Sequence, residues 1–247
     1  MIIMNHMIDN QHVQSYEILN NPKNMKKIKR YNYSNYEIWV SHDLVDYTEA
    51  LEIMQDCVTR IAKNLAKPTL WLLQHQEVYT AGRLTGENDF PPHLSDKIIS
   101  IDRGGKLTYH GPGQLVGYAI IPLKNEKRDI RTFIQGLECY ILNILQEAGI
   151  QEAQACREKV GIWVKNINNI SQSEKIASIG IKVRNWITSH GFALNIAPQL
   201  EKFDVIVPCG LANAKVTSIK NFNPSVKESY VIDSALKHAH NFLSRFI

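Results

Sequence analysis

The chain has 247 residues, of which 44% are apolar, and this length fits one large domain or two small ones; we expect one. Its 28 lysines and arginines against 24 aspartates and glutamates leave a net charge of +4, too small to indicate a nucleic-acid-binding protein. No segment approaches the roughly 18 consecutive apolar residues of a membrane span, and no secretory leader is recognisable, so we expect a cytoplasmic protein that does not bind membranes.

Residues 1–35 contain seven asparagines and a cluster of lysines, with little hydrophobic periodicity. This composition predicts a poorly ordered extension, with a single domain over residues 36–247. A short strand is expected at residues 37–40, followed by a helix that Ser41 or Asp43 caps. The apolar positions of that helix step by three and four: Leu44, Tyr47, Leu51, Met54, Val58, Ile61 and Leu65.

Apolar runs and turn residues predict the remaining elements. Strands are expected at 69–75, 97–103, 115–121, 160–164, 175–183 and 186–196, the last two forming a hairpin. Helices are expected at 129–148, ended by Gly149, and at 227–246. Strands and helices are interspersed without strict alternation, which favours an α/β or α+β domain with a mixed β-sheet flanked by helices.

The segment "RGGKLTYHGPGQLVGY" (103–118) contains five glycines within sixteen residues. It meets neither the GxGxxG nor the GxxxxGK[ST] spacing, so a nucleotide-phosphate site is not indicated. Two ordinary turns between strands would explain some of these glycines. Their density instead favours backbone that forms the wall of a narrow cavity, and the neighbouring apolar segments indicate a partly apolar ligand.

The four cysteines have no spacing typical of a zinc site, so we expect no metal. Cys209 lies in the segment "VIVPCGL", where the flanking proline and glycine would hold its sulfur toward a cleft. Cys57 and Cys139 fall on predicted helices and are expected to be small core residues, which is also the commonest role of a free cysteine.

A nucleophilic cysteine needs a neighbour that stabilises its thiolate. His110, His190 and Lys175 are the candidates. Lys175 opens an otherwise apolar strand, where lysine commonly marks a solvated strand end. If Lys175 faces the cleft instead, its ammonium group would stabilise the thiolate and exchange protons with it.

Four motifs in this order, "RGGKLTYHGPGQLVGY", "KIASIGIKV", "HGFALNI" and "PCGL", resemble the lipoyl(octanoyl) transferase family over about residues 36–219. The resemblance implies the fold of the lipoate and biotin protein ligases. It also implies a catalytic pair, with Cys209 as the nucleophile that forms an acyl thioester and Lys175 as its acid and base. The acyl-binding residues that it implies are Arg103, Gly104, Gly105, Lys106, Leu107, Thr108, Tyr109, His110, Ser178, Ile179, Gly180, Gly191, Phe192 and Ala193.

The reaction that the resemblance implies is transfer of an octanoyl group from octanoyl-acyl carrier protein, through Cys209, to a lysine of a lipoyl domain. The acceptors would be the lipoyl domains of 2-oxoacid dehydrogenases and the glycine cleavage H protein. No cofactor, metal or ATP is needed, because the donor is already a thioester, and Arg103 and His110 are candidates for orienting the acyl carbonyl. Two alternatives are an ATP-dependent lipoate or biotin protein ligase and a non-catalytic lipoyl-domain binder. A monomer is expected.

Overall fold

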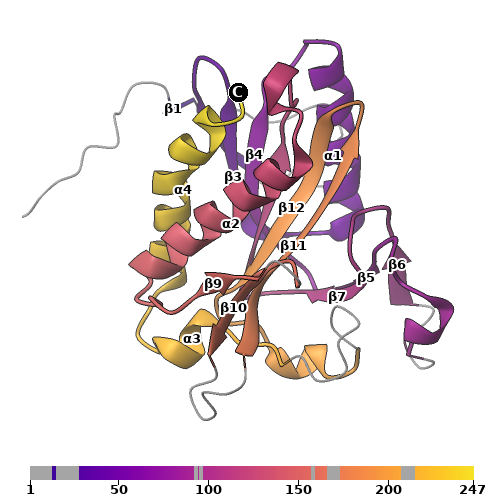
Figure 1. Ribbon diagram of the computed structural model, residues 1–247, viewed down its shortest axis with the longest axis vertical. Coiled ribbons are helices and arrows are strands. Elements are labelled where there is room, and N and C mark those ends of the chain that lie inside the picture. Colours follow the sequence, from indigo (N-terminus) through magenta and orange to yellow (C-terminus); the bar gives the residue numbers. More distant parts are fainter. Residues whose placement is uncertain are drawn as a thin grey trace, which may run out of the picture.

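The structure is a computed structural model that describes residues 13–14, 28–91, 94, 97–156, 159–165, 173–206 and 215–247. Within these ranges, nine strands form one mixed sheet in the order β1-β2-β3-β4-β8-β12-β11-β10-β9. Helices lie on both faces of this sheet (Figure 1). A second sheet of three described strands has the order β6-β5-β7. The predicted fold class, a mixed sheet flanked by helices, is confirmed.

The strands of the large sheet are β1 (Val13–Gln14), β2 (Ile28–Asn32), β3 (Glu37–Val45), β4 (Thr69–His75), β8 (Gln114–Ile120), β9 (Gln154–Ala155), β10 (Ile162–Lys165), β11 (Ser173–Arg184) and β12 (Ile187–Asn195). The small sheet contains β5 (Val78–Ala81), β6 (Ile98–Ser100) and β7 (Leu107–His110). The α-helices are α1 (Tyr47–Ala62), α2 (Ile130–Glu147), α3 (Ile219–Phe222) and α4 (Glu228–Ser244). Short 3₁₀ turns lie at Glu87–Asp89, Asn125–Lys127 and Leu200–Phe203.

Strand β4 shows why the centre of the sheet is apolar on both faces. Leu70 and Leu72 point into the core under α2 and α4, while Trp71 and Leu73 point into the core under α1. Successive side chains of a strand point to opposite faces, so a strand covered on both sides must be a continuous apolar run. The sequence "TLWLLQH" therefore forms β4 over the predicted residues.

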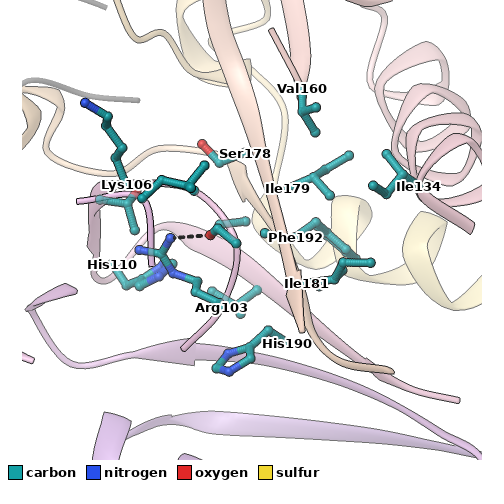
Figure 2. Close-up of a pocket in the computed structure, with 18 of the residues that line it drawn as sticks. Arg103, Lys106, His110, Ile134, Val160, Ser178, Ile179, Ile181, His190 and Phe192 are labelled. Atoms are coloured by element: carbon teal, nitrogen blue, oxygen red, sulfur yellow. Dashed lines mark hydrogen bonds between the residues drawn. The ribbon is translucent and has the colours of Figure 1, made fainter. Parts of the chain in front are cut away.

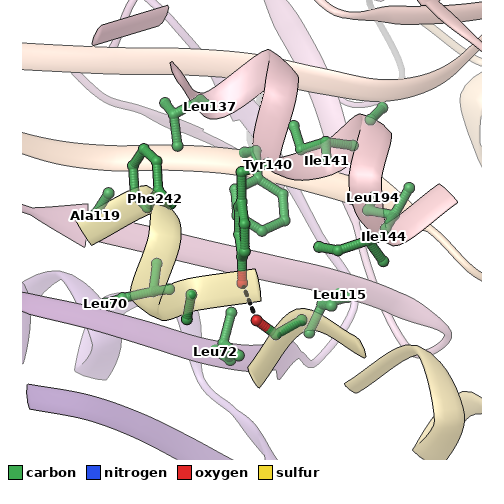
Figure 3. Packing of buried hydrophobic residues seen from close by; sticks show 14 of the residues in the cluster. Leu70, Leu72, Leu115, Ala119, Leu137, Tyr140, Ile141, Ile144, Leu194 and Phe242 are labelled. Carbon is green, nitrogen blue, oxygen red and sulfur yellow. Dashed lines mark hydrogen bonds between the residues drawn. The ribbon is translucent and has the colours of Figure 1, made fainter. Parts of the chain in front are cut away.

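The larger core lies between the sheet and the pair α2 and α4, as Figure 3 shows. Tyr140 of α2 stacks on Phe242 of α4 with ring centroids 5.2 Å apart. The Tyr140 hydroxyl donates a hydrogen bond of 2.7 Å to the Ala235 carbonyl, so this polar atom is satisfied inside the core. Asp129 caps α2. Gly149, with a φ of +88°, follows the end of this helix, as predicted.

The start of the first helix differs from the prediction. Strand β3 continues to Val45, and Asp46 caps α1 by accepting hydrogen bonds from the backbone of Thr48 and Glu49. Ser41 is not available as a cap because it accepts a 2.9 Å hydrogen bond from the Trp71 indole. Leu44 and Leu65, the two ends of the predicted apolar stripe, are exposed.

Strand β2 corrects the predicted domain boundary. Residues Ile28–Asn32 pair in antiparallel register with β3, so the sheet begins before Tyr36. The Arg30 guanidinium lies 4.3 Å from the centre of the Trp39 ring. Contacts of this kind allow a basic segment to join the sheet. Most of the rest of the predicted extension falls outside the described residues.

No helix in the described part of the chain is long and apolar enough to cross a membrane. Of the cysteines expected to be core residues, Cys57 is buried as predicted, whereas Cys139 is exposed on α2. Cys139 lies on the exposed side of that helix, because the buried side contains Leu137, Tyr140 and Ile141.

Candidate active site

A cavity of about 530 Å³, here called the main cavity, lies between the glycine-rich segment, β11, β12 and the first turns of α2. Its wall includes residues 103–108 and 110, Lys175, residues 178–180 and residues 191–193. In Figure 2 the side chains of Ile179, Ile181 and Phe192 lie together with Ile134 from α2, whereas Arg103 and His110 lie on the other side of β11. One region of the wall is therefore apolar and the other carries polar groups.

The glycine-rich segment reaches the cavity because β11 has a free edge beside it. In the described part of the chain, β10 pairs with β11 only at residues 173–177. Beyond that point the Gly104 N–H donates a 2.9 Å hydrogen bond to the Ile181 carbonyl. The segment thus occupies the position of a neighbouring strand. The short β7 within it was not predicted, and it pairs with β5.

Tyr109, one of the predicted acyl-binding residues, does not line the main cavity. Its ring packs against Phe203 and Tyr79, with both centroid distances 5.4 Å. Its hydroxyl donates to Glu77 at 3.1 Å. Tyr109 follows Thr108 and precedes His110 in β7, and alternation along a strand directs it away from the side that these two neighbours share.

Arg103 fixes the glycine-rich segment to the small sheet. Its guanidinium donates to the Thr80 carbonyl at 3.1 Å, to the Thr80 hydroxyl at 2.8 Å and to the Gly104 carbonyl at 2.9 Å. Arg103 is buried, and these contacts hold its charge at the edge of the main cavity. They leave it suited to orienting a partial negative charge on a bound ligand.

Three buried histidines lie on the polar side of the site. The rings of His75 and His110 are 5.8 Å apart, and His190 contacts the Tyr118 ring edge-on at 5.9 Å. Burial lowers the pKa of His75 to about 4, that of His110 to about 3 and that of His190 to about 4. The nearby Arg103 charge acts in the same direction on the pKa of His110 and His190. All three rings are therefore neutral near pH 7.

Lys175 lies on the inner side of its strand and is buried, with 5% of its surface exposed. Its ammonium nitrogen lies 5.1 Å from the centre of the Trp163 ring. A Cβ atom on Gly161 would lie 2.7 Å from the Lys175 Cε atom, and Gly161 also has a φ of +130°, so glycine is required here. The interpretation of Lys175 as a solvated strand end is wrong, and the lysine lines the main cavity.

Cys209 lies outside the described residues, but the residues on both sides of its segment are described. Ile206 packs in a small core with Tyr109 and Phe203, and Val216 packs against the same core. On the far side, the Lys175 N–H donates to the Lys215 carbonyl at 2.8 Å, and the Thr217 N–H donates to the Lys175 carbonyl at 2.9 Å. Both ends of the segment that carries Cys209 are therefore attached at this site.

Several cavity residues were not found from the sequence. Tyr47 and Tyr118 contribute from α1 and β8, and Ile130 and Ile134 contribute from α2. Both isoleucines fall within the predicted helix 129–148, which was not expected to contribute to the site. These two residues lie in the first turns of α2, and Ile130 is exposed. Their position at the start of the helix was the sequence signal that they could contribute to the site.

Replacing Gly191 with alanine is expected to destabilise the protein by about 3 kcal/mol or more, because the added Cβ would lie 2.1 Å from the Gly117 carbonyl oxygen. Backbone of the central strand β8 cannot move away without breaking its pairing with β12. Urea unfolding measures the loss. Gly86→Ala is the matched control, since its Cβ would meet nothing closer than 3.7 Å, and equal stability of the two variants would contradict the packing argument.

Comparisons with known proteins agree with this geometry. Residues 46–240 match the family described as the lipoyl protein ligase A/B catalytic domain. A protein of Bartonella tribocorum named octanoyltransferase is 42% identical over 207 residues, covering 81% of this chain and 83% of the relative. The octanoyltransferase of Novosphingobium aromaticivorans is 37% identical over 204 residues, covering 81% of this chain and 89% of the relative.

Solved structures show the same fold at low sequence identity. LipL1 of P. falciparum in complex with lipoate aligns with a TM-score of 0.64 and 14% identity, over 85% of this chain and 62% of that one. A bipartite lipoate protein ligase of Thermoplasma acidophilum aligns with a TM-score of 0.63 and 14% identity, over 85% and 83% of the two chains. Lipoate-protein ligase A bound with ATP aligns with a TM-score of 0.57 and 16% identity, over 72% and 73%. The cavity, the glycine-rich wall and these matches together place the chain in the lipoyl protein ligase A/B catalytic domain family.

Proposed function

We propose that the protein is an octanoyltransferase that moves an octanoyl group from octanoyl-acyl carrier protein to a lysine of lipoyl domains. The observation that carries this proposal is a partly apolar cavity with the buried Lys175 in its wall, in a chain 42% identical to a protein named octanoyltransferase. We propose a single catalytic domain that includes the strand Ile28–Asn32. The acceptors would be the lipoyl domains of 2-oxoacid dehydrogenases and the glycine cleavage H protein, and the cytoplasm stays the predicted compartment.

The reaction proceeds in two steps, a thioester exchange followed by amide formation. The Cys209 thiolate attacks the carbonyl carbon of the octanoyl thioester, the bond from that carbon to the carrier sulfur breaks, and an octanoyl thioester forms on Cys209. Lys175 takes the proton of the Cys209 thiol and returns it to the leaving carrier thiol. The neutral amine of the acceptor lysine then attacks the same carbonyl carbon, and an amide bond forms as the bond from that carbon to the Cys209 sulfur breaks. The proton that the amine loses passes to the Cys209 sulfur and regenerates the thiol.

The contacts of Lys175 support its part in this scheme. A buried cation close to a cysteine favours the thiolate over the thiol, because the charged pair is poorly screened away from water. The Trp163 ring and the Gly161 backbone restrict the lysine side chain, so its ammonium group is held in place before the donor binds. The main cavity then receives the octanoyl chain against Ile179 and Phe192.

Mass measurement of the intact protein tests the proposal. After incubation with octanoyl-acyl carrier protein, the wild-type chain is expected to gain the mass of one octanoyl group, and Cys209→Ala is expected to gain none. Cys139→Ala is the matched control, because Cys139 is an exposed thiol on α2 and should not affect the adduct. An adduct that persists in Cys209→Ala would remove Cys209 from the mechanism.

An ATP-dependent ligase is the second candidate, because a lipoate-protein ligase bound with ATP shares the fold. Such an enzyme would join free octanoate to AMP and release pyrophosphate before transfer. Incubation with ATP, octanoate and an acceptor domain therefore distinguishes the two. Release of pyrophosphate that depends on octanoate would support the ligase, and we expect none above the background without protein.

A further inference from the structure

A chain of buried side-chain hydrogen bonds runs from the main cavity to the segment beside Lys175. His110 Nδ1 lies 2.7 Å from Gln114 Oε1, and Gln114 Nε2 lies 2.9 Å from Asn195 Oδ1. Asn195 Nδ2 lies 2.9 Å from the carbonyl oxygen of Thr217. All four residues are buried. Gln114 and Asn195 are direct partners across β8 and β12, in a stretch where their strand neighbours are apolar.

The direction of these hydrogen bonds follows from one end. The Thr217 carbonyl can only accept, so Asn195 must donate through Nδ2 and accept through Oδ1. Gln114 must then donate to Asn195 through Nε2 and present its Oε1 as an acceptor to His110. The proton of neutral His110 is therefore on Nδ1. Its Nε2 is left as an acceptor, and among the described residues only Nδ1 of this ring is hydrogen bonded.

The other end of the chain lies at the backbone that holds Lys175. Thr217, whose carbonyl accepts from Asn195, also donates its N–H to the Lys175 carbonyl at 2.9 Å. Lys175 in turn donates its N–H to Lys215, and Lys175 and Val216 form a parallel bridge. Residues 215–217 follow directly on the segment that carries Cys209. The Asn195 side chain thus adds a hydrogen bond from β12 to the backbone bonds that tie this segment to β11.

We propose that Gln114 and Asn195 are positioning residues for acyl transfer. They hold residues 215–217 against Lys175 and lock His110 in the tautomer whose Nε2 accepts hydrogen bonds at the main cavity. The inference rests on the proposed octanoyl transfer and adds to it two residues that do not touch the reacting atoms.

This assignment narrows the role of His110. An acceptor nitrogen repels the carbonyl oxygen of a thioester and the oxyanion that forms from it, so neutral His110 does not donate to either. The donors for that oxygen must be other groups at the site, such as backbone N–H groups or Arg103. His110 Nε2 is instead suited to accept from an N–H group, which the amine of the acceptor lysine provides.

Asn195→Asp tests the positioning role, because it keeps the size of the side chain and the acceptor for Gln114 but removes the donor to Thr217. The single-turnover rate of octanoyl thioester formation is expected to fall about 100-fold, since small misplacements of reacting groups have effects of this size. Binding of octanamide, an uncharged probe of the cavity measured by calorimetry, is expected to stay within about twofold of wild type. Asn195→Ala, which adds no charge, is expected to show the same separation of rate from binding.

Asn221→Asp is the matched control, because Asn221 Nδ2 bonds the side-chain hydroxyl of the same Thr217 at 3.1 Å rather than its backbone. Its acylation rate is expected to match wild type. An unchanged rate in both Asn195 variants would overturn the inference, as would a loss of octanamide binding in step with the rate. Failure of the wild-type protein itself to form the thioester would instead contradict the proposed function.

The tautomer is tested separately by nitrogen NMR of the histidine rings. His110 is expected to show a protonated Nδ1 and a bare Nε2 in the wild-type protein at pH 7. In Gln114→Leu, which removes the acceptor, both nitrogens are expected to shift toward intermediate values. A protonated Nε2 in the wild-type protein would contradict the direction derived for the whole chain of hydrogen bonds.

Discussion

Replacing Lys175 with methionine is expected to slow formation of the octanoyl thioester by about 1000-fold, because the variant loses the cation and the proton acceptor together. Methionine is apolar and of similar length, so it can occupy the space beside Trp163 and Gly161. Single-turnover acylation at pH 7 measures the rate. Alkylation of Cys209 by iodoacetamide across a pH series is expected to show that a higher pH is needed to form the thiolate in the variant.

Lys159→Met is the control for this experiment. Lys159 also lines the main cavity and its ammonium nitrogen lies 5.6 Å from the centre of the same Trp163 ring, but its side chain is exposed. A lysine in contact with water stabilises a nearby anion much less than a buried one. Its removal is therefore expected to leave the acylation rate within about threefold of wild type. Equal losses in the two variants would show that the general charge of the cavity matters, and not Lys175.

Lowering the pH from 7 to 5 is expected to reduce the free energy of unfolding by about 2 kcal/mol for each of the three buried histidines. In the folded protein their pKa values are lowered to about 4, 3 and 4 for His75, His110 and His190, against an ordinary value of 6.5. Between these values the unfolded chain binds protons that the folded protein does not. The contribution of the three neutral histidines to the free energy of unfolding is therefore fully present above pH 6.5, and it is lost as the pH decreases toward 4.

Urea unfolding at pH 7, 6 and 5 measures this effect. The carboxyl groups with lowered pKa values, such as Asp46 and Asp102, lose their stabilising contributions mainly below pH 4, outside this window. His190→Gln removes one of the titrating rings and is expected to make the dependence on pH about one third weaker. Equal unfolding midpoints at pH 7 and pH 5 would contradict the burial of these rings as neutral groups.

The sequence predicted those elements whose signals are local. The unbroken apolar run of β4, the hairpin of β11 and β12, and the terminating glycine of α2 depend on residues close together in the chain. The start of α1 was wrong because the competing partner of Ser41 is Trp71 from another strand. In the small sheet, β6 lies within the predicted strand at 97–103. Strands β5 and β7 were missed because four residues are too few to show a pattern.

The same distinction applies to the site. The motifs indicated which segments would form the wall, and all the predicted acyl-binding residues except Tyr109 line the main cavity. The pairing of Gln114 with Asn195 joins residues 81 positions apart, and no pattern along a single sequence reveals such a contact. The direction of Tyr109 depends on the register of β7 with β5, which the sequence likewise leaves open.

The strand order of the large sheet has a consequence for synthesis of the protein. Strand β8 leaves the ribosome well before its neighbour β12, and Lys175 leaves before residues 215–217, which hold its backbone. A chain grows from its N-terminus, so the edge of β8 that later pairs with β12 stays unpaired until β12 has been synthesised. The reactive centre therefore comes together only late in translation, after most of the chain has emerged, and shortened nascent chains would lack the anchored Lys175.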